Sequence, residues 1–259
     1  MTRTKKTIII TGASSGLGAA IAINYSRFPC KLFLIGRSSE RLQQITDICS
    51  SNGAEILPIV LDVTDSEAME RNLKKIAEQD GIDIVIACAG VSAGTLDGPE
   101  TAKQVKKIFD VNVDGVLNTV LPVIPHMVER RSGQIAIVSS MAGFVGLASA
   151  PSYSASKGAV RLFSDALRGY LKPLGINVTT VIPGYIKTPM TKVNNFPMPF
   201  MISAEKAAQK IINGIGNGKE IIAFPWIMYL LMKVLSLLPS RVLTYINSKL
   251  PGKPAFEET

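Results

Sequence analysis

The chain has few of the residues that form covalent or metal-held frameworks. Its 259 residues include three cysteines, Cys30, Cys49 and Cys88, and one histidine, His126. None of them has the spacing of metal ligands, and an odd number of widely separated cysteines does not suggest a disulfide framework. We therefore expect a reducing, cytoplasmic environment, no structural zinc and no catalytic metal.

The chain also lacks a long apolar run near its N-terminus. Residues 7–11 follow a short basic stretch and are largely apolar, but the run stops at Gly12, well short of the hydrophobic region of a signal peptide. We interpret this stretch as a basic lead-in to a first buried strand.

Clustered arginines are missing too, although the chain is basic, with a formal net charge of +8. Residues 187–259 contain nine Lys or Arg against four Glu, and these cations stand singly among apolar residues. No nucleic-acid motif accompanies them, so we expect no nucleic-acid partner. An anionic membrane surface or an acidic ligand fits the pattern better.

Short apolar runs and helical patterns alternate along the chain. The runs predict strands, and the patterns between them predict helices, among them one continuous helix over 101–130. The predicted strands are 7–11, 31–36, 55–61, 82–87, 134–139, 176–182 and 219–224. This alternation predicts an α/β doubly wound fold with right-handed crossovers, as a single domain over 1–259.

A glycine-rich turn joins the first strand to the first helix. The turn runs through Gly12, Ser14, Ser15, Gly16, Leu17 and Gly18. Backbone N–H groups at the opening of a helix bind phosphate, and glycine lets the anion come close. The turn therefore indicates a dinucleotide site; the alternative is a flexible loop without a ligand.

The residues after the second predicted strand bear on the choice of cofactor. An acidic residue there would hold the ribose 2′-hydroxyl of NAD, but the chain has Gly36, Arg37 and Ser38. A guanidinium matches a 2′-phosphate, so we expect NADP rather than NAD. In the alternative interpretation Arg37 is only a solvated loop residue.

Tyr153 and Lys157 lie four residues apart at the start of a predicted helix, and therefore on one helix face. The ammonium would lower the phenol pKa and make Tyr153 a general acid or base. The alternative is a packed ring and a solvated amine. Asn112, in an apolar stretch of the 101–130 helix, is predicted to be either a buried structural bridge or part of the site.

Several motifs occur in a fixed order: Thr11-Gly12-x-x-x-Gly16-x-Gly18, Asp62-Val63, Asn112, Ser140, Tyr153-x-x-x-Lys157 and Pro183-Gly184. Together they resemble the classical short-chain dehydrogenase/reductase family over about residues 5–190. The resemblance implies a Rossmann-type fold with about seven parallel strands in the order 3-2-1-4-5-6-7. It also implies an NAD(P) cofactor and hydride transfer to or from a carbonyl or alcohol carbon.

The resemblance also implies roles for individual residues. Tyr153 would be the proton donor or base, Lys157 would lower its pKa and bind the nicotinamide ribose, and Ser140, rather than Ser139, would hold the substrate oxygen. Asn112 would position a water behind Lys157. The remaining cofactor contacts would be Asp62, Val63, Ala89, Gly90, Pro183, Gly184 and Thr188.

One position departs from the family pattern. Cys88 stands in Ala87-Cys88-Ala89-Gly90 where such enzymes often have asparagine. We expect a packing difference and a buried, inert thiol; the alternative is an oxidation-sensitive thiol near the cofactor.

The C-terminal quarter is apolar and basic. Residues 187–201 contain three prolines with Met and Phe, which predicts an irregular lid over a lipophilic substrate, or else a seal on the core. Residues 225–259 form an extension whose stretch 225–238 carries one charge. This stretch is a helix buried against the cleft, a subunit contact, or a segment on a membrane surface with Lys233, Arg241, Lys249 and Lys253 near phosphates.

Taken together, the sequence predicts an NADP(H)-dependent oxidoreductase for a lipophilic carbonyl or alcohol, such as a keto-lipid, a 3-oxoacyl compound or a steroid-like molecule. The alternatives are a non-catalytic dinucleotide-binding regulator and an NAD-dependent dehydrogenase of the same fold. Family members suggest a homodimer or homotetramer. The location would be cytoplasmic, with contact to the inner face of a membrane through 225–253.

Overall fold

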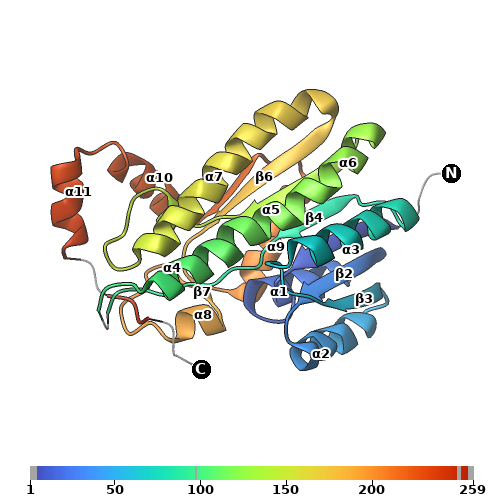
Figure 1. The fold of residues 1–259 in the computed structure, drawn as a ribbon, viewed down its shortest axis with the longest axis horizontal. Coiled ribbons are helices and arrows are strands. Elements are labelled where there is room, and N and C mark those ends of the chain that lie inside the picture. Colours follow the sequence, from blue (N-terminus) through green and yellow to red (C-terminus); the bar gives the residue numbers. More distant parts are fainter. Residues whose placement is uncertain (1–4, 97, 250–251, 256–259) are drawn as a thin grey trace.

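A seven-stranded parallel sheet forms the centre of the molecule (Figure 1). The computed structural model describes residues 5–96, 98–249 and 252–255. The strands follow the order β3-β2-β1-β4-β5-β6-β9, which confirms the predicted topology. Their bounds are β1 (Lys6–Thr11), β2 (Cys30–Gly36), β3 (Glu55–Val60), β4 (Ile84–Ala87), β5 (Gly133–Val138), β6 (Ile176–Pro183) and β9 (Ile221–Phe224). Two short strands, β7 (Ile186–Lys187) and β8 (Ile202–Ser203), pair separately.

Helices cover both faces of the sheet, so the central strands are apolar on both sides. Ile8 and Ile10 pack toward α1 (Gly16–Tyr25), α2 (Ser39–Ser50) and α9 (Ala204–Gly216). Ile9 packs toward the opposite layer, which Figure 1 shows in front. That layer contains α3 (Ser66–Gln79), α5 (Gly115–Val120), α6 (Ile124–Arg130) and α7 (Pro151–Leu171).

The predicted continuous helix over 101–130 is wrong in detail. The stretch is divided into α4 (Ala102–Phe109), a π-helical turn (Asp110–Asp114), α5, a short 3₁₀ turn (Leu121–Val123) and α6. Pro122 and Pro125 lack the N–H that a regular α-helix needs, and the wider turn carries Asn112.

By length and composition alone the stretch Ala102–Arg130 could cross a membrane. Its apolar side instead contributes to the core, where Val120, Val123 and Met127 are fully buried. The apolar composition of this stretch is therefore explained by packing within the domain.

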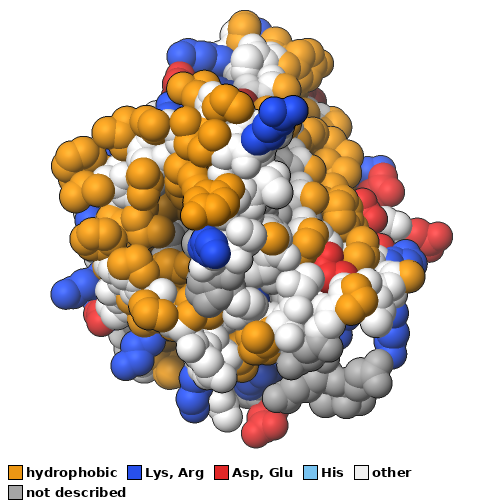
Figure 2. All heavy atoms as spheres, turned by 90° about the vertical axis from the view of Figure 1, so that its left-hand side faces the viewer, with side chains coloured by type: hydrophobic (Ala, Val, Ile, Leu, Met, Phe, Trp, Pro, Cys, Tyr) orange, Lys and Arg blue, Asp and Glu red, His pale blue; other side chains and the backbone are white. Residues whose placement is uncertain are grey.

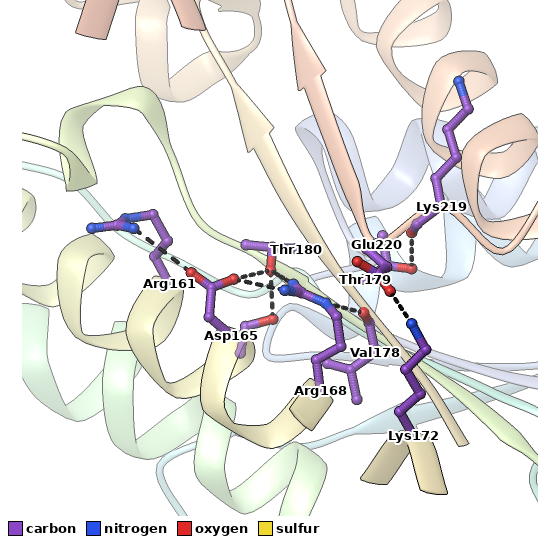
Figure 3. Close-up of polar contacts among 10 residues, drawn as sticks. Arg161, Asp165, Arg168, Lys172, Val178, Thr179, Thr180, Lys219 and Glu220 are labelled. Atoms are coloured by element: carbon purple, nitrogen blue, oxygen red, sulfur yellow. Dashed lines mark hydrogen bonds and ion pairs between the residues drawn. The ribbon is translucent and has the colours of Figure 1, made fainter. Parts of the chain in front are cut away.

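Helix α7, which carries Tyr153 and Lys157, is fixed to its neighbours at both ends. At its start, Ser152 donates from its backbone N–H and its hydroxyl to the Glu100 carboxylate, at 3.0 and 2.6 Å. Toward its end, Arg168 lies against β6 (Figure 3), where its Nε donates to the Val178 carbonyl at 2.9 Å. Asp165 pairs with Arg168 at 3.0 Å, and its other oxygen lies 3.7 Å from Arg161. These contacts set the position of α7 relative to the sheet.

The C-terminal helices stand apart from the sheet (Figure 1). Neither α10 (Trp226–Leu235) nor α11 (Ser240–Asn247) contains a buried residue. The inner side of α10 touches the loop after β5, where the Tyr229 and Phe144 rings meet edge to face at 5.6 Å. The alternative of a helix fully buried against the cleft is therefore wrong, because its other side remains exposed.

Candidate active site

A cavity of about 250 Å³ lies at the carboxyl ends of the central strands, the usual ligand position in an open parallel sheet. Most residues predicted from the sequence line it: Gly12, Ser14, Ser15, Gly16, Leu17, Gly18, Arg37, Asp62, Val63, Ala89, Gly90, Ser140, Tyr153, Lys157, Pro183, Gly184 and Thr188. Ser38 and Asn112 lie outside its lining.

The glycine-rich turn at one end has no space for side chains. An added Cβ at Gly18 would lie 2.2 Å from the Gly12 carbonyl oxygen, and Gly12 itself has a φ of +69°. Gly16 opens α1, also with positive φ, and faces the Thr188 side chain. The bare backbone at this helix opening fits a diphosphate group.

Two cations line the adjoining part of the cavity. Arg37 pairs loosely with Asp62, with 3.6 Å between Nη1 and Oδ2, and its side chain is 56% exposed. Arg41 also lines the cavity, and sequence reasoning missed it, although its place in the first turn of α2 was a usable signal. Ser38 caps α2 by accepting a hydrogen bond from the Arg41 backbone N–H at 3.4 Å. Its hydroxyl is thus engaged by the helix.

Tyr153, Ser140 and Lys157 gather at the other end of the cavity. Burial raises the pKa of the Tyr153 phenol, and a hydrogen bond with Ser140 opposes this rise. The expected lowering of this pKa by Lys157 is not found in the protein alone, because burial dominates. Burial lowers the pKa of Lys157 to about 8, while its Nζ donates to the Val138 carbonyl at 3.0 Å.

Asn112 is the buried bridge that one interpretation of the sequence predicted. Its Oδ1 accepts from the Val91 N–H at 2.8 Å, and its Nδ2 donates to the Val91 carbonyl and to Ser156 Oγ at 2.9 and 3.0 Å. A Cβ placed on Gly90 would lie 3.2 Å from Asn112 Oδ1 and 3.3 Å from Lys157 Nζ. Asn112 thus ties the loop after β4 to α7, directly beside Lys157.

Ser139 and Cys88 line the cavity, and each also makes a contact that holds the structure. Ser139 Oγ donates to the Lys157 carbonyl at 2.8 Å, so it holds α7. Burial of the sulfur raises the pKa of the Cys88 thiol to about 12, which indicates an unreactive thiol. The residue is only partly buried and lines the cavity, so the expectation of a fully buried cysteine is wrong. Thr11 Oγ1 accepts hydrogen bonds from the N–H groups of Cys88 and Ala89 at 3.1 and 3.3 Å, which fastens the loop that follows β4 to β1. Among residues 5–96, 98–249 and 252–255 no cluster of three potential metal ligands occurs.

The segment predicted as a lid borders the cavity. Thr188, Met190 and Thr191 line it, and α8 (Pro189–Lys192) begins there with reciprocal contacts between Thr188 and Thr191. Farther along, Phe200 is 56% exposed, which argues against the alternative of a core seal.

Comparison with known proteins finds similar chains among oxidoreductases. Residues 6–197 match the family model described as short chain dehydrogenase. The chain is similar to an uncharacterized oxidoreductase of Myxococcus xanthus, at 38% identity over 91% of this chain and 93% of the relative. An uncharacterized oxidoreductase of Staphylococcus aureus is 31% identical over 84% and 94%.

Solved structures show the same fold. A short-chain dehydrogenase from Sphingobium yanoikuyae in complex with NADPH matches with a TM-score of 0.79 and 24% identity, over 97% of this chain and 99% of that one. A short-chain type dehydrogenase/reductase from Mycobacterium marinum matches with a TM-score of 0.76 and 26% identity, over 84% and 93%.

Proposed function

Because the chain belongs to the short-chain dehydrogenase family, whose members are oxidoreductases of CH–OH and C=O groups, we propose that it is an NADP(H)-dependent carbonyl reductase or alcohol dehydrogenase. One observation carries this proposal: the glycine cradle and the group of Ser140, Tyr153 and Lys157 line the same cavity. A non-catalytic dinucleotide-binding regulator would not need that group of side chains.

The bound nicotinamide would supply or accept the hydride. Ser140 and Tyr153 would hydrogen-bond the substrate oxygen, where negative charge develops as the carbonyl is reduced. The raised pKa keeps the Tyr153 hydroxyl protonated near neutral pH, so that it can give its proton to that oxygen. Lys157 would bind the nicotinamide ribose, and Asn112 would keep Lys157 and the loop after β4 in place and position a water behind Lys157.

The two arginines support a preference for NADP. Arg37 and Arg41 line the part of the cavity next to Asp62 and Val63, where the adenosine of the cofactor would bind. A 2′-phosphate would gain two charge-assisted contacts there. The Sphingobium yanoikuyae structure contains NADPH, and a similar structure from Beutenbergia cavernae, described as a putative gluconate 5-dehydrogenase, contains NADP. The alternative is an NAD-dependent dehydrogenase, which would bind NADH more tightly than NADPH in a cofactor titration.

The substrate side favours a lipophilic molecule, such as a keto-lipid, a 3-oxoacyl compound or a steroid-like ketone. Met190 lines the active-site cavity. A second cavity of about 540 Å³ lies between α11 and the loop that follows Ser140, with Phe144, Val145 and Leu147 in its lining. Apolar walls of this kind suit a hydrocarbon. By analogy with the family, we propose assembly as a homodimer or homotetramer.

We also propose that α10 and α11 contact the inner face of a membrane from the cytoplasm. Exposed apolar side chains gather on this side of the molecule (Figure 2), including Trp226 at 69% and Leu237 at 84%. No acidic residue occurs from 221 to 255, whereas Lys233, Arg241 and Lys249 are exposed. This combination complements an anionic lipid surface. With ten residues, α10 is too short to span it.

The catalytic proposal is tested by Tyr153→Phe. NADPH oxidation with a panel of ketones should fall by about 10²–10⁴-fold, because the proton donor is lost, while the NADPH dissociation constant should change little. Tyr170→Phe is the matched control, since Tyr170 lies on the same helix and is 67% exposed. Unchanged turnover in Tyr153→Phe would contradict the assignment.

The membrane proposal is tested by sedimentation with phosphatidylglycerol vesicles. The wild type should sediment with them, and the double variant Trp226→Ser, Leu230→Ser should remain in the supernatant. Leu162→Ser is the control, because Leu162 is exposed on α7. Equal sedimentation of the double variant and the wild type would refute this contact.

A further inference from the structure

Residues 252–255 return from the C-terminal helices to the loop that follows β4, beside the ring of Tyr153. The Pro254 carbonyl accepts a hydrogen bond from the Gly94 N–H, and the Lys253 carbonyl accepts one from the Leu96 N–H, both at 2.8 Å. The contact is close enough to require glycine at position 94. An added Cβ there would lie 2.5 Å from Lys253 Cβ and 2.3 Å from the Ser149 carbonyl oxygen. The segment is thus packed against the loop that follows β4.

This packing turns Lys253 inward. Its Nζ donates to Ser92 Oγ at 2.7 Å and lies 5.6 Å from the centroid of the Tyr153 ring. The expectation that Lys253 belongs with the cations at the lipid surface is therefore wrong. Its ammonium lies over the ring of the tyrosine that would protonate the substrate, next to the residues that line the active-site cavity but not among them.

Lys253 has no anionic partner within the described parts of the chain. The ion pairs found there do not include it, and its bonded neighbour, Ser92, is neutral. Burial lowers its pKa to about 8, with no compensating acidic residue among the causes. A half-buried ammonium that finds no counterion among the described residues is unfavourable, and a substrate anion would relieve that cost.

We propose that Lys253 is a substrate-binding residue that recognises a carboxylate a few bonds away from the reacting carbonyl. This inference rests on the proposed function, because it takes Tyr153 as the group that faces the carbonyl. The preferred substrates would then be oxo acids, or the matching hydroxy acids, that carry an apolar chain. The carboxylate would bind Lys253. The apolar chain would lie against Met190 in the active-site cavity and toward the second cavity, which Phe144 and Leu147 line.

The test compares 4-oxononanoate with its methyl ester, which differ in one negative charge. Calorimetric titration of the NADP⁺-saturated protein at pH 7 should show the acid binding about tenfold tighter than the ester, the ratio expected of one charge-assisted hydrogen bond. Lys253→Met should reduce that ratio to about one, and Lys253→Arg should keep most of it. Lys249→Met, which removes an exposed cation four positions earlier in the sequence, should leave the ratio unchanged.

Three results would overturn the proposal: equal affinities of the wild type for acid and ester, an unchanged ratio in Lys253→Met, or no binding of the acid at millimolar concentration. The NADPH dissociation constant of each variant, measured separately, should equal that of the wild type and shows that the site is folded. A wrong reductase assignment would give a different result. The wild type would turn over no ketone but would still bind the acid more tightly than the ester.

Discussion

The phosphate cradle and the C-terminal helices differ sharply in how tightly they are packed. At the cradle, the Gly12 carbonyl oxygen occupies the place of any side chain at Gly18, and Ile9 and Ile10 beside it are fully buried. In α10 and α11 no side chain is buried. The glycine cradle is thus fixed by the core, whereas α10 and α11, which we propose to border the substrate, lie largely outside it.

This difference separates two kinds of specificity. A cofactor shared across a family can be held by backbone and glycine, which leave little freedom to vary. A substrate is selected by exposed elements, whose side chains can change at low cost to stability. The following predictions would sharpen this contrast or remove it.

The largest effect is expected for Gly18→Ala. The new methyl group would overlap the Gly12 carbonyl oxygen, so the free energy of unfolding should fall by about 3 kcal/mol and NADPH should bind more than tenfold more weakly. Gly216→Ala in α9 is the control, because its Cβ would meet nothing within 4 Å and alanine favours helices. Urea unfolding and NADPH titration measure both. Equal effects of the two variants would contradict a rigid cradle.

The next largest effect should be a gain. Lys157→Met removes a buried ammonium. Burial lowers the pKa of Lys157 from 10.5 to about 8, so the charged side chain destabilises the folded protein by at most roughly 3 kcal/mol. The variant also loses the hydrogen bond from Lys157 to the Val138 carbonyl, which destabilises it by about 1 kcal/mol. The protein without cofactor should therefore be about 2 kcal/mol more stable at pH 7 in urea unfolding, although inactive.

The pH dependence of that gain has a definite sign. Below pH 8 Lys157 is charged in both states, so the penalty is complete. As the pH rises from about 8 toward the unfolded value of 10.5, the folded state loses its proton first and the wild type gains stability. The advantage of Lys157→Met should therefore shrink over this range. A difference that stays constant from pH 7 to 10 would show that burial does not perturb Lys157.

A smaller effect is expected at the adenosine end. Arg37→Ala and Arg41→Ala should each weaken NADPH binding by about tenfold, or about 1.4 kcal/mol, and leave NADH binding nearly unchanged. Arg71→Ala, an exposed arginine on α3, is the control. Fluorescence titration with both cofactors measures the ratio, and an unaltered NADPH/NADH ratio in both variants would reject the preference for NADP.

The smallest effect should come from the C-terminal helices. Leu230 is 54% exposed, so Leu230→Ala should change the free energy of unfolding by less than about 0.5 kcal/mol. Leu34 is fully buried in β2, so Leu34→Ala should lower the free energy of unfolding by about 2–5 kcal/mol. Similar losses in urea unfolding would mean that α10 is part of the core in solution, for example at a subunit contact.

The sequence predicted the fold and most of the cavity because these depend on local patterns. Alternating runs placed the strands, and the motif residues from Gly12 to Gly184, except Asn112, line one cavity. What it missed depends on contacts between distant segments or on backbone detail. Asn112 lies in a π-helical turn that no apolar period reveals, and the pairing of Lys253 with Ser92 joins residues 161 positions apart.

The position of Lys253 in the chain has a consequence for biosynthesis. A ribosome makes Tyr153 about a hundred residues before it makes Lys253, so the emerging chain can complete its cofactor site before the segment 252–255 arrives. Cleavage within the exposed helix α11 would separate this segment from the rest of the chain. On our proposal, a protein cleaved there would still hold its cofactor but would no longer distinguish an acid from its ester.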